Sequence, residues 1–390
     1  MRRMYLWVIS VFIIAFQAQG EFVAGVRVGC QNKVSEPIAG ENRLIVDFGS
    51  GTTKFKLLEF DQQNNIWGVV DELSIPIPHQ KCLEESIVEF NLSAECIADG
   101  IASVKYGLES MGVDCNEIRC IGVATAWARL TKNLDKYFKP IQNELKIKTI
   151  VLSQMQEGAV AFVASIPFLK EKYPGSDLSK VIVWDIGGGS FQQVAARNIN
   201  LNDYSDVLAA RNALHSNLGP WGSVNFAHSL YKHLGINNTS RLLVGDEIKL
   251  ASEFAGSLFG DLNSTAIAKR IKNPEVEVYA IGEFMNKGFL PFNSIVGKFT
   301  LDWAYLLRAM FASIDPNKEL QACDVMKTLS PNFDCGIMKM IETNLLLVIA
   351  IMESTGLKSF NFMPEVSVAG AMGHIEQLIE SLYNDPREIE

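Results

Sequence analysis

Short apolar runs alternate with turn-forming residues along most of the chain, and longer stretches have the spacing of helices. From residue 43 onward, Leu44–Phe48 and Thr53–Phe60 predict two strands joined by a Gly-rich turn. Ile66–Leu73, Ile118–Ala124 and Ile147–Leu152 predict three more strands. The helical stretches are Ala94–Met111, Met155–Leu169, Gly222–His233, Arg241–Phe259, Thr300–Ser313, Ile337–Ser354 and Val366–Tyr383. This mixture of elements predicts an α/β protein.

The pattern restarts near the middle of the chain. Ser153-Gln154-Met155-Gln156 has the form of a capping box, which predicts a helix beginning there. After Pro174-Gly175-Ser176, Val181–Trp184 and Phe191–Ala196 predict a second strand pair around another Gly-rich turn. We therefore expect a first domain over residues 43–173 and a second over residues 174–365, with a C-terminal helix within residues 366–390 that packs near the first domain.

The first 20 residues have the composition of an export signal. Arg2 and Arg3 are followed by the apolar run Leu6–Phe16 and by Ala18-Gln19-Gly20, a small-x-small cleavage site. The run is too short to cross a bilayer, which needs about 20 residues. We expect a signal peptide over residues 1–20, a linker or arm over 21–42, and an exported, periplasmic or secreted mature protein.

Composition narrows the class of protein. The chain has 390 residues, 48% hydrophobic and 20% charged, and a formal net charge of −9, with 35 Lys and Arg against 44 Asp and Glu. This composition is typical of a globular protein. The negative net charge disfavours binding to nucleic acid, because binding its phosphate backbone requires cationic side chains. Seven cysteines can oxidise after export; Cys82–Cys96 and Cys323–Cys335 are candidate pairs, but spacing leaves the connectivity open.

Two turns share one pattern. Leu44-Ile45-Val46-Asp47-Phe48-Gly49-Ser50-Gly51-Thr52 and Ile182-Val183-Trp184-Asp185-Ile186-Gly187-Gly188-Gly189-Ser190 both read apolar-apolar-apolar-Asp-apolar-Gly-x-Gly-Ser/Thr. Glycines let backbone N–H groups approach an anion, and the hydroxyl adds a donor. Asp47 and Asp185 can hold a divalent cation that a phosphate shares. Such paired loops predict a clamp on a phosphate chain, although a duplicated fold with inactive hairpins would give the same pattern.

These motifs resemble those of the superfamily of actin and sugar kinases, and within it the exopolyphosphatase/guanosine pentaphosphate phosphatase (Ppx/GppA) family. The segments Asp47–Lys54, Ala124–Asn133, Asp185–Ser190 and Leu218–Gly222 are similar to family blocks. The resemblance implies two ribonuclease-H-like (actin-like ATPase) domains with the active site in the cleft between them. It also implies a hydrolase of phosphoanhydrides that uses Mg²⁺ or another divalent cation, and dimers occur in the family.

The resemblance assigns roles to individual residues. Glu157, in Ser153–Ala159, aligns with the family's catalytic carboxylate and would activate water. Asp47 and Asp185 would hold the metal. The predicted phosphate-binding residues are Gly49, Ser50, Gly51, Thr52, Lys54, Arg129, Gly187, Gly188, Gly189, Ser190 and Gln192.

Some features depart from this family. Gln192 stands where the family has Glu, and Lys54 where it has Arg. Gln192 and Glu157-Gly158 resemble features of apyrases instead. Ile281-Gly282-Glu283 lies where a third Gly-rich loop is expected, but the Gly-Gly-Thr of that loop is absent. The leading hypothesis is an exported exopolyphosphatase acting on the ends of inorganic polyphosphate. The alternatives are an apyrase-like nucleoside tri- or diphosphatase and a non-catalytic polyphosphate- or nucleotide-binding protein, and for all three we expect no membrane contact beyond the export signal.

Overall fold

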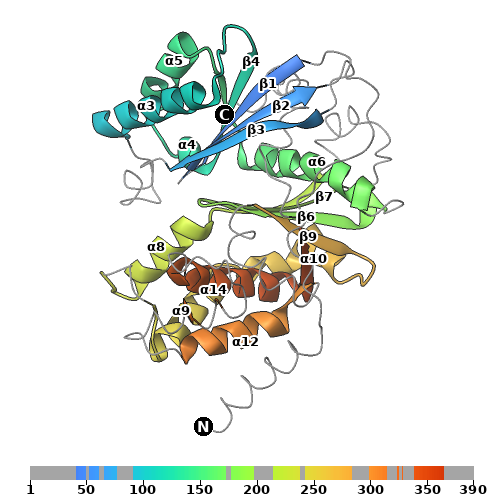
Figure 1. Cartoon of the computed structure of the whole chain (residues 1–390). Helices are drawn as coiled ribbons and strands as arrows, with labels where there is room; N and C mark the ends of the chain where they lie inside the picture. Colours follow the sequence, from blue (N-terminus) through green and yellow to red (C-terminus); the bar gives the residue numbers. More distant parts are fainter. Residues whose placement is uncertain are drawn as a thin grey trace. The chain divides into compact units, whose positions relative to one another are not determined.

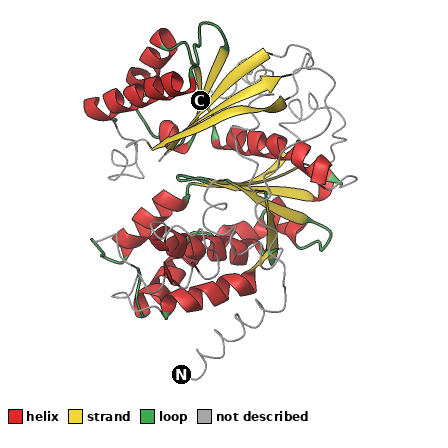
Figure 2. Cartoon of the chain, viewed as in Figure 1, coloured by secondary structure: helices red, strands yellow, loops and turns green. Residues whose placement is uncertain are grey.

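In a computed structural model of the chain, the fold contains two mixed β-sheets (Figures 1 and 2). The structure describes residues 41–49, 52–60, 66–76, 91–172, 177–196, 214–237, 242–282, 298–313, 323–324, 327 and 338–363. The predicted signal peptide, residues 21–40 of the arm, the loop residues Ser50 and Gly51, and the C-terminal helix lie outside these residues.

The first sheet has five strands in the order β3-β2-β1-β4-β5. The strands are β1 (Glu41–Phe48), β2 (Thr52–Phe60), β3 (Ile66–Pro76), β4 (Arg119–Ala124) and β5 (Lys148–Val151). The pairs β3-β2 and β2-β1 are antiparallel, and β1-β4 and β4-β5 are parallel. β1 begins earlier than predicted, because Glu41 and Asn42 pair with Phe60 and Glu59 of β2.

Helices cover one face of this sheet. Leu44, Val46 and Phe48 point into a core shared with α3 (Ala94–Met111) and α5 (Asp135–Glu144), which lie on the same side of the sheet in Figure 1. Alternation along the strand therefore places Asp47 on the opposite face. In the register of β1 and β2, Lys54 is directly opposite Asp47, so both side chains occupy that second face.

The second sheet repeats this topology. Its order is β10-β11-β9-β6-β7-β8, with β6 (Val181–Ile186), β7 (Phe191–Ala196), β8 (Leu214–Gly219), β9 (Glu277–Ile281), β10 (Phe299–Thr300) and β11 (Ser359–Phe362). The run β8-β7-β6 is antiparallel and β6-β9-β11 is parallel, as in the first sheet. The predicted α/β class is therefore confirmed, and the matching strand orders agree with the repeat in the sequence.

Each face of the second sheet carries its own core. Ile182, Trp184 and Phe191 pack against one group of helices, and Val183 and Val194 pack against α6 (Gln154–Lys172). The first group comprises α8 (Ser223–His233), α9 (Asp246–Ser257), α10 (Ala266–Ile271), α12 (Leu301–Ala312) and α14 (Met338–Thr355). No helix of the described residues is long and apolar enough to span a membrane.

Two helices differ from the expectation. α9 begins at Asp246 rather than Arg241. Gly245 has a positive φ of +51°, which glycine adopts readily but which is incompatible with a right-handed helix, so the helix cannot extend back through this residue. α6, which the sequence places in the first domain, packs on β6, β7 and β8 of the second sheet. Gly40–Glu390 form one compact unit, so the boundary near residue 173 stays a prediction.

Two predictions about local chemistry have different outcomes. The capping box is confirmed: the Gln156 side chain accepts from the Ser153 backbone N–H at 2.7 Å, and Ser153 Oγ accepts from the Gln156 backbone N–H at 3.2 Å. Among the cysteines, the structure joins Cys115 to Cys120, a pair that the sequence did not suggest. Cys96 and Cys323 are also disulfide-bonded, but Cys82 and Cys335, their suggested partners, lie outside the described residues.

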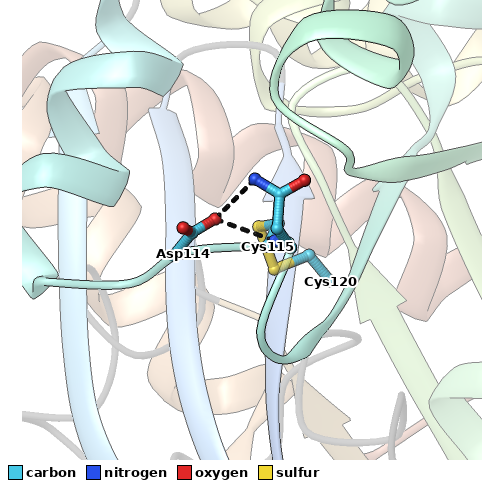
Figure 3. Close-up of a disulfide and its surroundings, with 4 residues drawn as sticks. Asp114, Cys115 and Cys120 are labelled. Atoms are coloured by element: carbon cyan, nitrogen blue, oxygen red, sulfur yellow. Dashed lines mark hydrogen bonds between the residues drawn. A yellow bond between two sulfur atoms is a disulfide. The ribbon is translucent and has the colours of Figure 1, made fainter.

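The Cys115–Cys120 disulfide joins the loop after α3 to the start of β4 (Figure 3). In that loop the Asp114 carboxylate accepts from the backbone N–H and the side-chain amide of Asn116, both at 2.8 Å. We expect the double variant Cys115→Ser/Cys120→Ser to lose about 2 kcal/mol of unfolding free energy, because opening a short loop returns entropy to the unfolded chain. Urea unfolding of both proteins measures the difference. Asn116→Ala is the control for the loop itself, and a loss in the control equal to that of the double variant would contradict the prediction.

Candidate active site

The candidate site lies where β4, the first turn of α6 and the β6–β7 hairpin meet. α4 (Ala126–Arg129) follows β4 directly. Its Trp127 is buried, and the indole Nε1–H donates to the Phe48 carbonyl at 2.6 Å. This bond ties α4 to the end of β1, just before the first Gly-rich turn. The same short helix carries Arg129, whose guanidinium contacts Leu152, Glu157 and Ser190.

Glu157 sits in the first turn of α6, where the helix dipole favours a negative charge. Gln154, at the start of the helix, donates from Nε2 to the carbonyls of Phe191 and Gly219 at 3.1 and 2.7 Å. Gly158 faces β7 so closely that a Cβ there would lie 2.7 Å from Val194 Cγ2 and 3.2 Å from Gln192 Cβ. These contacts bring the Glu157 carboxylate against the second hairpin.

Three side chains donate to one oxygen of Glu157. Arg129 Nη1 lies 2.8 Å from Glu157 Oε2, Gln192 Nε2 lies 3.1 Å from it, and Ser190 Oγ lies 3.5 Å from it. Arg129 also donates to Ser190 Oγ at 3.0 Å and to the Leu152 carbonyl at 2.8 Å. Among the described residues, no donor contacts Glu157 Oε1.

Burial and neighbouring charges together shift the pKa values of the buried carboxyls Glu157 and Asp185. Burial raises the pKa of Glu157, and the charge of Asp47 adds to this, whereas the charge and hydrogen bond of Arg129 and the hydrogen bond from Ser190 lower it. Burial also raises the pKa of Asp185 well above its usual range. The negative charges of Glu157 and Asp47 raise it further, and Lys54 opposes them.

Asp185 occupies a confined position. In the register of the second sheet it lies opposite Gln192 on β7, as Asp47 lies opposite Lys54 in the first sheet. Gly282 has a φ of +100°, and a Cβ there would lie 2.9 Å from Asp185 Oδ1. Among the described residues no hydrogen-bond donor contacts the Asp185 carboxylate. A buried carboxylate without a donor, surrounded by further negative charge, is suited to a cation.

The second Gly-rich turn is oriented by α8. The carbonyls of Gly187 and Gly188 accept from the backbone N–H groups of Ser223 and Val224 at 3.0 and 2.8 Å, and the Gly189 carbonyl accepts from Asn225 Nδ2 at 3.0 Å. With its carbonyls bound to α8, the turn offers the N–H groups of Gly188 and Gly189, for which the described residues provide no acceptor. Such N–H groups are typical anion ligands.

The structure thus brings together most of the residues that the motifs predict. One hydrogen-bonded cluster contains Arg129, Glu157, Ser190 and Gln192. The charge of Asp47 raises the pKa of Glu157. The charges of Glu157 and Asp47 raise the pKa of Asp185, and the charge of Lys54 lowers it. Gly49 closes the first turn by donating to the Thr52 carbonyl at 3.1 Å. Ser50 and Gly51 lie outside the described residues.

Sequence reasoning missed the anchoring roles of Trp127 and Gln154 and the contact of Gly282 with Asp185. Gly282 could have been identified because it lies where a third Gly-rich loop is expected. Trp127 could have been identified because it lies within the Ala124–Asn133 motif. Gln154 had no signal of its own, because its partners are backbone carbonyls of a distant hairpin.

Metal binding was expected at Asp47 and Asp185. Among the described residues, no three or more His, Cys, Asp or Glu side chains form a group that could hold a metal ion. Mg²⁺ is commonly bound by one or two carboxylates together with water and substrate phosphate. Two carboxylates beside N–H groups suited to phosphate fit that mode of binding.

The paired sheets and the site between their hairpins define a class, the two-domain α/β proteins of the actin-like ATPase fold. Residues 88–215 match the model of the Ppx/GppA phosphatase family. This match confirms the resemblance that the motifs predict and supports the assignment of the chain as a phosphoanhydride hydrolase. No curated protein sequence matches the chain.

Solved structures agree on the fold. A Ppx/GppA family member from Aquifex aeolicus is 17% identical, with a TM-score of 0.58 over 88% of this chain and 99% of that one. An exopolyphosphatase from Cytophaga hutchinsonii is 11% identical, with a TM-score of 0.59 over 86% of this chain and 98% of that one. An exopolyphosphatase-like protein is 14% identical, with a TM-score of 0.59 over 87% and 99% of the two chains. At these identities the likeness establishes the fold, and the predicted two-domain fold class is confirmed.

Proposed function

We propose that the chain is an exported, metal-dependent exopolyphosphatase that releases terminal phosphate from inorganic polyphosphate. The observation that carries the proposal is the arrangement at Glu157, where three donors hold Oε2 and the described residues leave Oε1 without a donor. A carboxylate held in this way presents one basic oxygen to a water molecule. The family match and the exopolyphosphatase among the similar structures support this substrate class.

Glu157 would act as the general base. Its Oε1 accepts a proton from water as that water attacks the terminal phosphorus, and the phosphoanhydride bond breaks as the shortened chain leaves. Ser190 and Arg129 keep Oε2 in place during this step. The raised pKa of Glu157 means that turnover should increase with pH as this carboxyl loses its proton.

The two turns would hold the phosphate chain. The N–H groups of Gly188 and Gly189 have no acceptor among the described residues and are suited to phosphate oxygens. Asp47 and Asp185 would hold Mg²⁺ or another divalent cation, which when bound neutralises phosphate charge. The Lys54 ammonium, whose charge acts on Asp185, supplies positive charge on the side of the first sheet.

Export is supported by the leader and by the disulfides. The sequence of residues 1–20 has the parts of a signal peptide. Cys115 is bonded to Cys120, and Cys96 and Cys323 are disulfide-bonded as well. Disulfides persist in oxidising compartments and are rare in the cytosol.

One observation favours a second candidate, an apyrase-like nucleoside tri- or diphosphatase. The position opposite Asp185 carries an amide, Gln192, which packs against Gly158. Both residues are among the apyrase-like features of the sequence. The amide leaves one carboxylate fewer for metal than the Glu of the Ppx/GppA pattern.

The test is phosphate release by the mature protein, beginning at residue 21, with and without Mg²⁺. Polyphosphate, ATP, ADP and GTP are assayed in parallel at equal concentrations of terminal phosphate. We expect metal-dependent release with polyphosphate preferred. A preference for the nucleotides would move the assignment to the apyrase-like candidate. Binding without turnover on any of the four would contradict both and indicate a non-catalytic binding protein.

A further inference from the structure

We propose that Gln192 is a positioning residue for Glu157 and contacts no phosphate. The inference rests on the proposed function, because it assigns Gln192 to the carboxylate that the proposal makes the general base. It departs from the phosphate-binding role that the motif implies for this residue. The geometry that carries it is the pair of hydrogen bonds from Gln192 Nε2, to Glu157 Oε2 at 3.1 Å and to Ser190 Oγ at 2.9 Å.

The amide of Gln192 has no donor left for a phosphate. A side-chain amide carries two N–H donors on Nε2 and an acceptor on Oε1. Glu157 and Ser190 already accept from Nε2. Oε1 is buried, and the part of the chain that the structure describes provides no hydrogen-bond partner for it. Since phosphate oxygens are also acceptors, Oε1 cannot bind them.

The orientation of the amide follows from its surroundings. Exchanging Oε1 and Nε2 would place a carbonyl oxygen against the Glu157 carboxylate, which is repulsive. The orientation seen leaves Oε1 without a partner among the described residues, although an unpaired buried polar atom destabilises the folded state. The amide therefore takes the orientation in which Nε2 donates to Glu157.

The backbone holds the two residues together. Gln192 is fully buried on the face of β7 that packs against α6. Gly158 allows the helix to approach that strand, since its Cβ position is only 3.2 Å from Gln192 Cβ. Glu157 and Gln192 thus belong to one packed layer, whereas Arg129 reaches Glu157 from α4, the short helix that follows β4 of the first sheet. From the β6–β7 hairpin, Gln192 donates to Glu157 at 3.1 Å and Ser190 donates to it at 3.5 Å, so Gln192 makes the shorter of the two bonds.

The test compares Gln192→Met with Gln193→Met. Methionine has a similar length and no donor. Gln193 is equally buried, but it lies on the opposite face, where its amide oxygen accepts from Asn217 Nδ2 at 3.1 Å. We expect Gln192→Met to lower kcat about 10- to 100-fold with KM within about twofold, as for residues that orient a reacting group. Gln193→Met is expected to keep both parameters. Thermal unfolding of both variants checks that each is folded.

A double variant separates positioning from a general structural effect. If Gln192 acts through Glu157, Gln192→Met should change kcat by less than about twofold when Glu157 is already Gln. A rise in KM with kcat unchanged, or an equal loss of kcat in the Glu157→Gln background, would overturn the inference. In either case the proposed function would stand, provided that Glu157→Gln alone lowers turnover by at least about 100-fold. Full turnover by Glu157→Gln would instead refute the proposed mechanism.

Discussion

Replacing Glu157 with Gln is expected to reduce the rate of phosphate release by about 100- to 10,000-fold, the usual contribution of a general base. The amide keeps the size of the side chain but cannot take a proton from water. Its carbonyl oxygen can still accept from Arg129 and Gln192, so the fold should persist. The readout is kcat on the preferred substrate in the presence of Mg²⁺, with binding measured separately.

The control for this variant is Glu95→Gln. Glu95 also lies in the first turn of a helix, α3, but it is exposed and outside the site. An ordinary carboxylate at a helix N-terminus stabilises the helix through its dipole and takes no part in a reaction. The Glu95→Gln control should therefore retain full activity. Equal rates for the two variants would refute the assignment of Glu157 as the base.

Asp185→Asn is expected to have opposite effects on activity and on stability. Activity should fall at least about 100-fold, because a metal ion contributes several kcal/mol of charge stabilisation and Asn is a poor replacement ligand. The metal-free variant should be more stable than the natural protein at pH 8. Burial and the charges of Glu157 and Asp47 raise the pKa of Asp185, so its ionised form is unfavourable in the folded state.

The pH dependence of this effect has a definite sign. A carboxyl whose pKa is raised by folding binds its proton more tightly in the folded state than in the unfolded state. Below the unfolded pKa both states are protonated and the penalty is absent. It grows as the pH rises from the unfolded pKa towards the folded one. The stability advantage of Asp185→Asn should therefore be small at pH 4 and larger at pH 8.

The measurement is urea unfolding at both pH values in the presence of EDTA and in the presence of Mg²⁺. Asp135→Asn is the control, because Asp135 is exposed and forms an ion pair with Lys139 on the surface of α5. Added Mg²⁺ should stabilise the natural protein and the control, and Asp185→Asn should respond less. Equal stabilisation of all three proteins by Mg²⁺ would contradict a metal role for Asp185.

The cluster explains how groups of one motif acquire different tasks. Ser190 and Gln192 belong to the same hairpin, yet their side chains meet at one oxygen of Glu157. Gly188 and Gly189, which lie beside them, direct their carbonyls to α8. A motif that reads as a single phosphate loop therefore contains a part suited to the anion and a part that holds the Glu157 carboxylate.

The sequence by itself determined the local elements of this protein. The repeated Asp-x-Gly hairpins, the capping box at Ser153 and the boundaries of α3 and β7 all follow from neighbouring residues. Their signals are turn chemistry, caps and hydrophobic period, which act over a few positions. The same motifs predict the family resemblance and the candidate residues Arg129, Glu157 and Gln192, which the structure places in one hydrogen-bonded cluster.

Only the tertiary structure decided which of these residues meet. The packing of α6 on the second sheet, the three donors on Glu157 Oε2 and the contact between Gly282 and Asp185 each join segments far apart in the chain. Such contacts depend on how sheets and helices pack, because packing selects one partner among many chemically similar ones. Gln192 illustrates the difference: its position follows from the motif, but the two acceptors of its amide are set by the fold.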